Sequence, residues 1–274
     1  MTASEVIEST QNPLIKRIRS IKTRKGRKKD RTFWVEGLAP TLEALQAGWD
    51  IEVIVRCPEV FRSEEASRLI SETEPRIRDV TKNVFESISD RDGPTGLGAI
   101  VRVRDLGLGA LEIQSGSLLT VLVEPQDPGN LGSILRTTYS AGGSGVVLVG
   151  QSTDPYDPRA VRASMGAIFR VPVVRELRVD AFVEWVSASD VSLVGTSSRG
   201  NANHRGYDYP SPMGLVMGNE QKGIPVELIE ACEVLVKIPM AGTLRSLNLS
   251  AATAVVLYEA AHQIGLHDPP TGTS

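Results

Sequence analysis

Three short runs of the sequence are almost entirely apolar, and they constrain the fold more than any other feature. The runs are Leu118–Val123, Gly145–Val149 and Met213–Met217. Five or six apolar residues without polar alternation are typical of strands that are buried on both faces of a parallel sheet. Weaker strand patterns of the same kind are predicted at residues 170–174, 191–195 and 234–238.

Helical segments separate these strands along the chain. Helices are predicted at residues 160–166, 181–188, 225–231 and 247–264. Strands that alternate with helices indicate parallel βαβ units, so this part of the chain is expected to form an α/β domain with helices on both faces of its sheet. Domains of this class usually bind ligands in the loops at the carboxyl ends of their strands.

The N-terminal part of the chain shows a shorter alternation of strands and helices. Strands are predicted at Thr32–Glu36, Ile51–Arg56 and 99–103, and helices at 40–46, 63–71 and 81–87. The glycine-containing stretch 104–116 lies between two strand patterns and is interpreted as a linker. The expected organisation is a basic segment (1–31), a small α/β domain (32–104), a linker (105–116), a larger α/β domain (117–266) and a disordered tail (267–274).

Positive charge is concentrated in one short window of an otherwise acidic chain. The net charge is −3, yet ten of the 30 lysines and arginines fall between residues 16 and 31, where only Asp30 opposes them. A cationic segment on an acidic body favours a polyanionic partner such as a nucleic acid, although a solvated helix face or a flexible tail explains the charge equally well. The candidate RNA-binding residues are Lys16, Arg17, Arg19, Lys22, Arg24, Lys25, Arg27, Lys28, Lys29 and Arg31.

Other patterns argue against several classes of protein. No apolar run approaches the 18 residues of a membrane span, and the first ten residues lack the apolar core of a secretory signal. Cys57 and Cys232 lie far apart without metal-ligand spacing, so we expect reduced thiols in a cytoplasmic protein and no metal site. Neither a Walker-type phosphate loop nor a GxGxxG fingerprint is present, which disfavours a dehydrogenase.

The loop after Leu118–Val123 reads EPQDPGNLGSILRT (residues 124–137). Pro128 and Gly129 predict a turn, and Asn130 or Ser133 could cap the following helix. Arg136 lies six residues beyond Asn130 and is expected near the same face of that helix, where its planar guanidinium could hold a phosphate. Taken alone, the loop favours an ordinary helix cap and a surface arginine over a phosphate-binding site.

Two further loops carry unusual polar residues. The loop GNEQKGIP (218–225) has two glycines that allow close approach of a ligand, with Glu220 beside the strand end. The stretch IPMAGTLRSLNLS (238–250) places Ser246, Asn248 and Ser250 around the start of an apolar helix. Helix capping explains one of these three side chains but not all of them.

Together these loops resemble the motifs of the SpoU (TrmH-type) RNA methyltransferases of the SPOUT superfamily. The matching pattern is Asn130-x-Gly132-x3-Arg136, Gly218-Asn219-Glu220-x2-Gly223, and Ile238-Pro239-Met240 with Ser246-Leu247-Asn248-x-Ser250. The three motifs occur in order over residues 118–264. The N-terminal part resembles, more loosely, the small ribosomal-protein-like substrate-binding domain of many members, and residues 154–167 are similar to members that modify ribosomal RNA.

The resemblance implies a fold and a chemistry that the pattern analysis does not supply. It implies an α/β domain with a trefoil knot, S-adenosylmethionine as cofactor, a homodimer whose active site is completed across the interface, and methylation of an RNA ribose 2′-oxygen without a metal. The implied cofactor-binding residues are Gly218, Ile238, Leu247, Met240, Thr196 and Ser250. The implied catalytic residues are Arg136, with Asn130, Glu220, Ser246 and Asn248 in support.

The role of Arg136 and the identity of the RNA are separate questions. Because arginine stays protonated in proteins, we favour Arg136 as a clamp on the adjacent phosphate and leave the general base unassigned. The basic window and the additional domain favour ribosomal RNA over tRNA. A catalytically degenerate RNA-binding protein is the alternative from another class, and the intact Asn130, Arg136, Glu220, Ser246 and Asn248 disfavour it.

Overall fold

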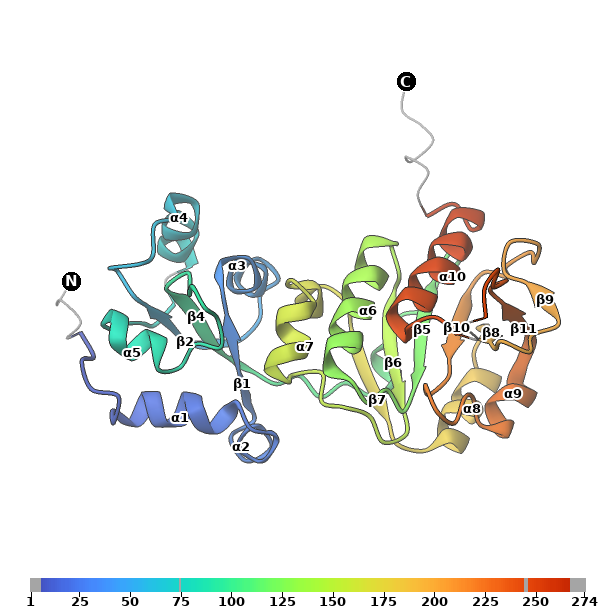
Figure 1. Cartoon of the computed structure of the whole chain (residues 1–274), viewed down its shortest axis with the longest axis horizontal. Helices are drawn as coiled ribbons and strands as arrows, with labels where there is room; N and C mark the ends of the chain where they lie inside the picture. The colour runs from blue at the N-terminus through green and yellow to red at the C-terminus, as the bar shows by residue number, and fades with distance from the viewer. Residues whose placement is uncertain (1–5, 74, 244–245, 267–274) are drawn as a thin grey trace, which may run out of the picture. The chain divides into compact units, whose positions relative to one another are not determined.

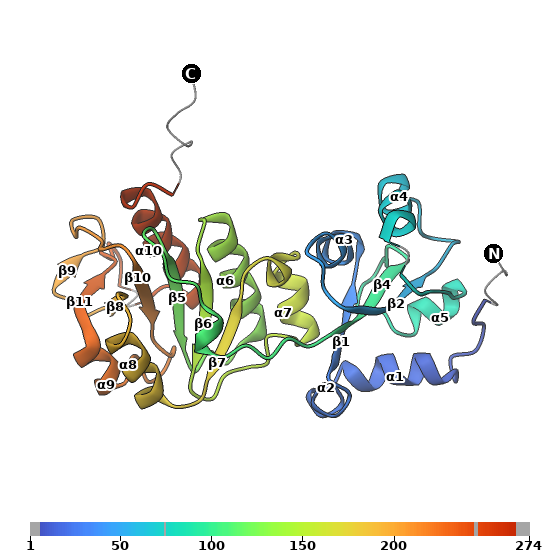
Figure 2. The same cartoon turned by 180° about the vertical axis from the view of Figure 1, so that it is seen from behind.

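The computed structural model describes residues 6–73, 75–243 and 246–266, and it divides the chain into two compact units. Unit 1 comprises Met1–Arg104 together with Tyr156–Arg170, and unit 2 comprises Asp105–Pro155 together with Val171–Ser274. Both units are α/β folds, as Figures 1 and 2 show from opposite sides. The predicted α/β class is therefore confirmed.

Unit 1 is built on a four-stranded mixed sheet with the order β1-β4-β2-β3. The antiparallel part pairs β1 (Thr32–Glu36) and β2 (Ile51–Arg56) with the central β4 (Leu97–Arg102), and β3 (Ile77–Asp79) runs parallel to β2. Its helices include α3 (Leu38–Gln46), α4 (Glu64–Thr73) and α5 (Lys82–Glu86). Apolar residues from β1, β2, β4 and α5 form one continuous core with the N-terminal helix α1.

The basic window forms two short helices that pack against each other, α1 (Pro13–Ile21) and α2 (Arg24–Asp30). Ile15, Ile18 and Ile21 recur every three residues and are fully buried, so α1 presents one apolar face to the core. The two helices meet closely at Gly26, where a Cβ atom would lie 1.9 Å from the Ser20 carbonyl oxygen. Van der Waals contact therefore fixes the packing of α1 and α2, although this segment is strongly charged.

Residues Tyr156–Arg170, which leave unit 2 between two of its strands, complete the core of unit 1. They contain α7 (Pro158–Ala163) and the 3-10 turn Ala167–Phe169. Phe169 and Tyr156 pack against Phe33 and Trp49, and the Trp49 indole donates a hydrogen bond of 3.0 Å to the Phe169 carbonyl. Unit 1 is thus assembled from two separate pieces of the sequence.

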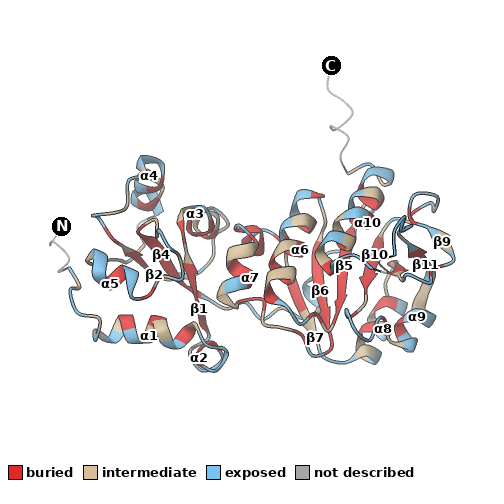
Figure 3. Cartoon of the chain, viewed as in Figure 1, coloured by how far each residue is buried: buried red, intermediate tan, exposed pale blue. Residues whose placement is uncertain are grey.

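Unit 2 contains a seven-stranded sheet in which every neighbouring pair is parallel. In spatial order its strands are β7 (Val173–Glu176), β6 (Gly145–Val149), β5 (Leu118–Val123), β10 (Met213–Met217), β8 (Ser192–Thr196), β11 (Cys232–Lys237) and β9 (Ala202–Asn203). The central β5, β6 and β10 are buried along their whole length, as their apolar sequences predict (Figure 3).

Helices cover both faces of this sheet. On one face α6 (Pro128–Ser140) and α10 (Leu249–Gln263) pack together, and the Thr120 hydroxyl of β5 is hydrogen-bonded to Thr138 of α6 at 2.9 Å. On the other face Val121 of β5 joins a core with α8 (Val179–Ser187) and α9 (Val226–Ala231). Because successive strand residues face opposite sides, a strand covered in this way is apolar apart from side chains such as Thr120 whose polar group is hydrogen-bonded.

The last strand in the sequence, β11, is inserted between two strands that precede it. β11 lies between β8 and β9, which are joined by residues 197–201. Gly200 in this connection lies so close to β11 that a Cβ atom would be 2.5 Å from the Leu235 carbonyl oxygen. The chain then returns to α10, which packs on α6. This threading agrees with the trefoil knot that the family resemblance implies.

Most predicted elements are present, and the differences are local. β7 begins three residues later than the strand predicted at 170–174, because the chain up to Arg170 belongs to unit 1. Helices α1 and α2 and the short strands β3 and β9 were not predicted. The tail predicted to be disordered, 267–274, lies outside the described residues. Within the described part of the chain, no helix is long and apolar enough to cross a membrane.

The contact at Gly26 yields a stability prediction. In a helix, Gly→Ala normally stabilises, but here the added Cβ would overlap the Ser20 carbonyl, so we expect Gly26→Ala to destabilise unit 1 by about 2 kcal/mol. The control is Gly93→Ala, where a Cβ atom meets nothing within 4 Å. Thermal unfolding followed by circular dichroism should show a lower midpoint for Gly26→Ala only. Equal midpoints would contradict the close contact.

Candidate active site

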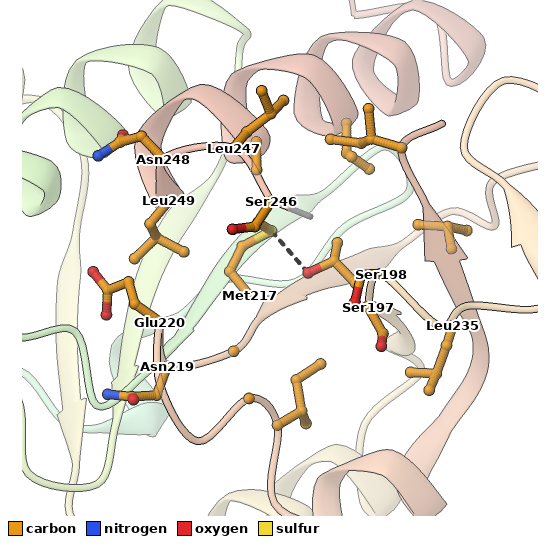
Figure 4. A pocket seen from close by; sticks show the side chains of 18 of the residues that line it. Ser197, Ser198, Met217, Asn219, Glu220, Leu235, Ser246, Leu247, Asn248 and Leu249 are labelled. Atoms are coloured by element: carbon orange, nitrogen blue, oxygen red, sulfur yellow. Dashed lines mark hydrogen bonds between the residues drawn. The ribbon is translucent and has the colours of Figure 1, made fainter. Parts of the chain in front are cut away.

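A cavity of about 540 Å³ opens at the carboxyl ends of β8, β10 and β11 in unit 2. This size is ordinary for a site that holds a small organic ligand. The side chains come from segments that are distant in the sequence and converge on the hollow in Figure 4. The lining residues are Thr196–Ser198, Met217–Glu220, Gly223, Ile224, Ile229, Leu235, Val236, Ile238, Met240, Ser246–Leu249, Ala252 and Val256.

The cavity brings together most of the site residues predicted in unit 2. Of those expected to bind a cofactor, Thr196, Gly218, Ile238, Met240 and Leu247 line it. Of those expected to be catalytic, Glu220, Ser246 and Asn248 line it as well. Asn130, Ser250 and Arg136 are not among the lining residues, and the first two reach the cavity through hydrogen bonds.

Two features of the 218–223 loop fix its shape. Gly218 lies against Gly223, where a Cβ atom would be 2.6 Å from the backbone carbon, so no side chain fits there. The Asn219 side chain, which is 8% exposed, accepts hydrogen bonds from the amides of Gln221 (2.9 Å) and Lys222 (3.0 Å). The loop is therefore a tight turn closed by one buried amide.

Glu124, the first residue after β5, joins this loop to the first motif. Its backbone has a φ of +44°, which is uncommon for a residue with a side chain. The Glu124 carbonyl accepts hydrogen bonds from the side-chain amides of Gln126 (2.8 Å) and Asn219 (2.9 Å), and its carboxylate pairs with Lys222 (3.1 Å). In this conformation the Glu124 carbonyl accepts from a side chain of the loop after β5 and from a side chain of the 218–223 loop, and so links the two loops.

A line of side-chain hydrogen bonds connects α10, α6 and the 218–223 loop. The Ser250 hydroxyl donates to Asn248 Oδ1 (2.6 Å), and Asn248 Nδ2 donates to Asn130 Oδ1 (3.0 Å). Asn130 Nδ2 then donates to Glu220 Oε1 (3.3 Å). Helix capping supports both asparagines: Asn248 caps α10, and the Asn130 amide bonds the α6 cap, Asp127. All three predicted motifs meet in this line.

An apolar wall faces these polar groups. It includes Ile238, Met240 and Leu247, of which Met240 and Leu247 are 37% and 40% exposed. Thr196 donates a hydrogen bond to the Val216 carbonyl (3.1 Å) and contacts the Met217 sulfur (3.4 Å), the dashed line in Figure 4. Exposed apolar side chains around a cavity suit a flat, weakly polar ligand group.

The sequence reasoning missed several residues of the cavity. Ser197 and Ser198 follow β8, and Leu235 and Leu249 complete the apolar wall. The rule that ligands bind beyond the carboxyl ends of parallel strands would have indicated the two serines, because they follow the strand predicted at 191–195. No sequence signal marked Leu235 or Leu249 as anything but core.

Arg136 lies away from the cavity of its own chain. Six helical residues correspond to about 600°, so Arg136 is rotated about 120° from Asn130, and the expectation that both share one face was wrong. The side chain is exposed on α6, and in the part of the chain that the structure describes it forms no hydrogen bond or ion pair. It is therefore free to contact a ligand or another molecule.

The basic residues of the N-terminal window have two different environments. Arg17, Arg19 and Lys22 form hydrogen bonds within unit 1, and Arg27 is 3% exposed and donates to the last carbonyls of α1. The bonds of Arg17 to Asp30 and Glu52 raise the pKa of this guanidinium. The remaining predicted residues are exposed: Lys16, Arg24, Lys25, Lys28, Lys29 and Arg31.

Both cysteines are free thiols. Cys57 is buried, and Cys232 is partly buried. Burial raises the pKa of Cys232 to about 12 and also raises that of Cys57. A thiol with a pKa near 12 is protonated at neutral pH, so Cys232 is a poor nucleophile. Among the described residues no group of three or more His, Cys, Asp or Glu could hold a metal ion.

Comparison with known families identifies both units. The model of the SpoU rRNA methylase family matches residues 117–258, and that of the MRM3-like substrate binding domain matches residues 12–99. The first match covers more than half of the chain. The chain belongs to the SpoU rRNA methylase family. The predicted family is therefore confirmed, and so is the presence of a substrate-binding domain.

Relatives of this SpoU methylase match over nearly its whole length. It is 29% identical to the 23S rRNA (uridine(2479)-2′-O)-methyltransferase of Streptomyces viridochromogenes, over 84% of this chain and 83% of the relative. It is 28% identical to the 23S rRNA (guanosine(2553)-2′-O)-methyltransferase RlmP of Bacillus subtilis, over 92% and 97%. The crystal structure of an AdoMet-bound rRNA methyltransferase from Sinorhizobium meliloti has a TM-score of 0.86 at 37% identity, over 94% and 98%.

The buried amide of Asn219 yields a prediction about local stability. Asn219→Ala removes the acceptor for two loop amides and the donor to Glu124, so we expect the Gln221 and Lys222 amides to exchange with solvent about 10- to 100-fold faster. Hydrogen exchange followed by NMR measures this. The control is Asn201→Ala, at an exposed asparagine with no hydrogen bond among the described residues. Unchanged protection at Gln221 and Lys222 would show that the side chain does not hold the loop.

Proposed function

We propose that this SpoU methylase transfers a methyl group from S-adenosylmethionine to the 2′-oxygen of a ribose in ribosomal RNA. The observation that carries the proposal is the meeting of three separate sequence motifs: two of them line one cavity, and the first is hydrogen-bonded to both through Asn130. The relatives support the same reaction, since two are named as 2′-O-methyltransferases of 23S rRNA and a structural neighbour is described as AdoMet-bound.

The residues around the cavity fit the proposed cofactor. Its volume of about 540 Å³ accommodates a ligand of this size, and the apolar side chains of Ile238, Met240 and Leu247 suit the faces of an adenine ring. Gly218 leaves the loop backbone bare, so its polar groups can contact a ligand edge directly. Ser250 does not line the cavity and supports it through Asn248.

The chemistry asks for alignment and for removal of one proton. S-adenosylmethionine supplies a methyl group bound to a positively charged sulfur. The neutral thioether that departs when this methyl group is transferred is a good leaving group. The protein must therefore place the ribose hydroxyl in line and provide a proton acceptor. Glu220, Ser246 and Asn248 are the polar side chains on the cavity side where an acceptor hydroxyl could be held.

Arg136 is exposed and is not among the described residues that line the cavity, which favours a role at the surface of a homodimer. We propose that Arg136 holds the phosphate next to the target ribose and that the site is completed by a second copy of the chain. Exposed apolar side chains on the same pair of helices support such an interface: Tyr139 of α6 is 49% exposed, and Val255 and Tyr258 of α10 are 39% and 43% exposed.

The exposed face of α2 provides a surface for RNA. Arg24, Lys25, Lys28 and Lys29, here called the α2 cationic stripe, fall within an arc of about 140° on α2. In the described structure none of them pairs with a carboxylate. A rigid stripe of unpaired cations suits the phosphates of a structured RNA, so the proposed substrate is ribosomal RNA. The proposed location is the cytoplasm.

The reaction itself is tested with radiolabelled S-adenosylmethionine and rRNA. We expect methyl incorporation by the wild type, none by Arg136→Ala, and at least tenfold less by Arg136→Lys, because one ammonium cannot bind a phosphate in two places. Cofactor binding measured by calorimetry should be unchanged in both variants, and Arg68→Lys at an exposed position of α4 is the control. Near-wild-type turnover of Arg136→Lys would refute the clamp, and incorporation into tRNA alone would refute the rRNA assignment.

The α2 cationic stripe makes a prediction about salt dependence. Replacing Lys25, Lys28 and Lys29 with Gln should weaken RNA binding and reduce the slope of log K against log salt by roughly 2 to 3, because fewer counterions are released. Filter binding at several salt concentrations measures the slope. The matched control replaces Arg68, Arg76 and Lys82, exposed cations of the same unit, with Gln. Equal slopes for the two triple variants would exclude the stripe as the contact.

A further inference from the structure

The group that accepts the ribose proton can be assigned from the cavity itself. Among the described residues that line the cavity, Glu220 is the one side chain with a carboxylate, and the others are apolar, amide or hydroxyl groups and glycine backbone. Histidine, cysteine, lysine and arginine are absent from the same described lining. A proton acceptor must lie within reach of the reacting hydroxyl, and a carboxylate is a common one.

The hydrogen bonds behind Glu220 have one direction, and the end of α10 sets it. The backbone amides of Ser250 (2.9 Å) and Ala251 (3.4 Å) both point to Asn248 Oδ1. A backbone amide can only donate, so this atom must be the oxygen of the Asn248 side chain. The nitrogen of the same side chain consequently faces Asn130.

The direction is carried through Asn130 to the carboxylate. Asn248 Nδ2 donates to Asn130 Oδ1 at 3.0 Å, which leaves Asn130 Nδ2 to donate to Glu220 Oε1 at 3.3 Å. Every donor in the line therefore points from α10 toward Glu220. This line of groups, Ser250–Asn248–Asn130–Glu220, is called the amide relay below.

The amide relay leaves one carboxylate oxygen available. Glu220 Oε1 accepts from Asn130, whereas Oε2 has no hydrogen-bond partner in the described structure. α10 has 15 residues, and its N-terminus carries the positive end of the helix dipole. Oriented amide donors that begin there and end at Oε1 suit a negatively charged carboxylate, and they hold it in one orientation.

We propose that Glu220 is the proton acceptor for the ribose 2′-hydroxyl and that Asn130 and Asn248 are positioning residues that act through the amide relay. The proposal rests on the proposed methyl transfer. The hydroxyl oxygen forms its bond to the methyl carbon while its proton passes to Glu220 Oε2, and the electron pair of the broken carbon–sulfur bond stays on sulfur. Sulfonium and carboxylate become thioether and carboxylic acid, and the acid then releases its proton to water.

Two isosteric variants separate the chemistry from the support. Glu220→Gln keeps the size of the side chain but removes the proton acceptor, so we expect single-turnover methylation of rRNA to fall by about 100-fold or more. Asn248→Asp still caps α10, since Asp caps helices as well as Asn does, but it cannot donate to Asn130. We expect this variant to lose at least about tenfold in rate with an unchanged melting temperature. Glu227→Gln, at an exposed glutamate of α9, is the matched control.

A readout independent of activity is the side-chain amide signal of Asn130 in ¹H–¹⁵N spectra of the free protein. The signal should shift in Glu220→Gln and in Asn248→Asp, and it should stay in place in Glu227→Gln. An Asn130 signal with the same chemical shift in wild type, Glu220→Gln and Asn248→Asp would show that the amide relay does not exist in solution.

The outcomes also distinguish this proposal from the proposed function. Glu220→Gln that binds S-adenosylmethionine within threefold of wild type by calorimetry, and still methylates within threefold, would overturn the assignment of Glu220 and leave the methyltransferase intact. A wild-type protein that neither binds S-adenosylmethionine nor methylates RNA would refute the proposed function, and this proposal with it. Cofactor binding retained together with a 100-fold loss of rate is the expected result.

Discussion

The parallel pairing of β5 with β10 is the constraint on which the active site depends. These strands are far apart in the sequence, yet their register places Leu122 opposite Met217. Both strands therefore end at the same edge of the sheet, one residue apart. The next residues on each side can then meet, and the Glu124 carbonyl accepts from Asn219 across 95 positions of sequence. Burial of both strands between two layers of helices makes the register costly to shift, since a slip of one residue would exchange the two faces. The contact between the loop after β5 and the 218–223 loop is a consequence of this register.

The sequence predicted the site better than it predicted the surroundings of the site. Strands such as Leu118–Val123 were predicted to the residue, because burial on both faces leaves a continuous apolar run that few other structures produce. The motif residues Glu220, Asn248 and Asn130 meet as expected, although nothing in one sequence reveals the direction of their hydrogen bonds. The prediction that Arg136 shares a helix face with Asn130 was wrong for a geometric reason, since six residues do not return to the same face of a helix. The family resemblance, not periodicity, supplied the knot.

Two features of unit 1 show why its sequence was harder to interpret. The charge of the N-terminal window concealed the spacing of Ile15, Ile18 and Ile21, and those three residues decide that α1 is a packed helix. Arg27 shows the same limit at a single residue, since a guanidinium that caps the carbonyls of α1 cannot be told from a solvated one by sequence. The contribution of Tyr156–Arg170 is a long-range event that local patterns do not encode.

That contribution also bears on how the substrate-binding unit can be inherited or transplanted. A recombination event that moved residues 1–104 alone would leave Phe33 and Trp49 without Tyr156 and Phe169, and would leave Glu43 without the partner Arg170. The exposed aromatic surface would then favour aggregation over folding. A viable chimaera must carry both pieces, one of which is embedded between two strands of the methylase sheet. The two units of this chain therefore have separate folds, but unit 1 cannot be transferred to another protein as one continuous segment of sequence.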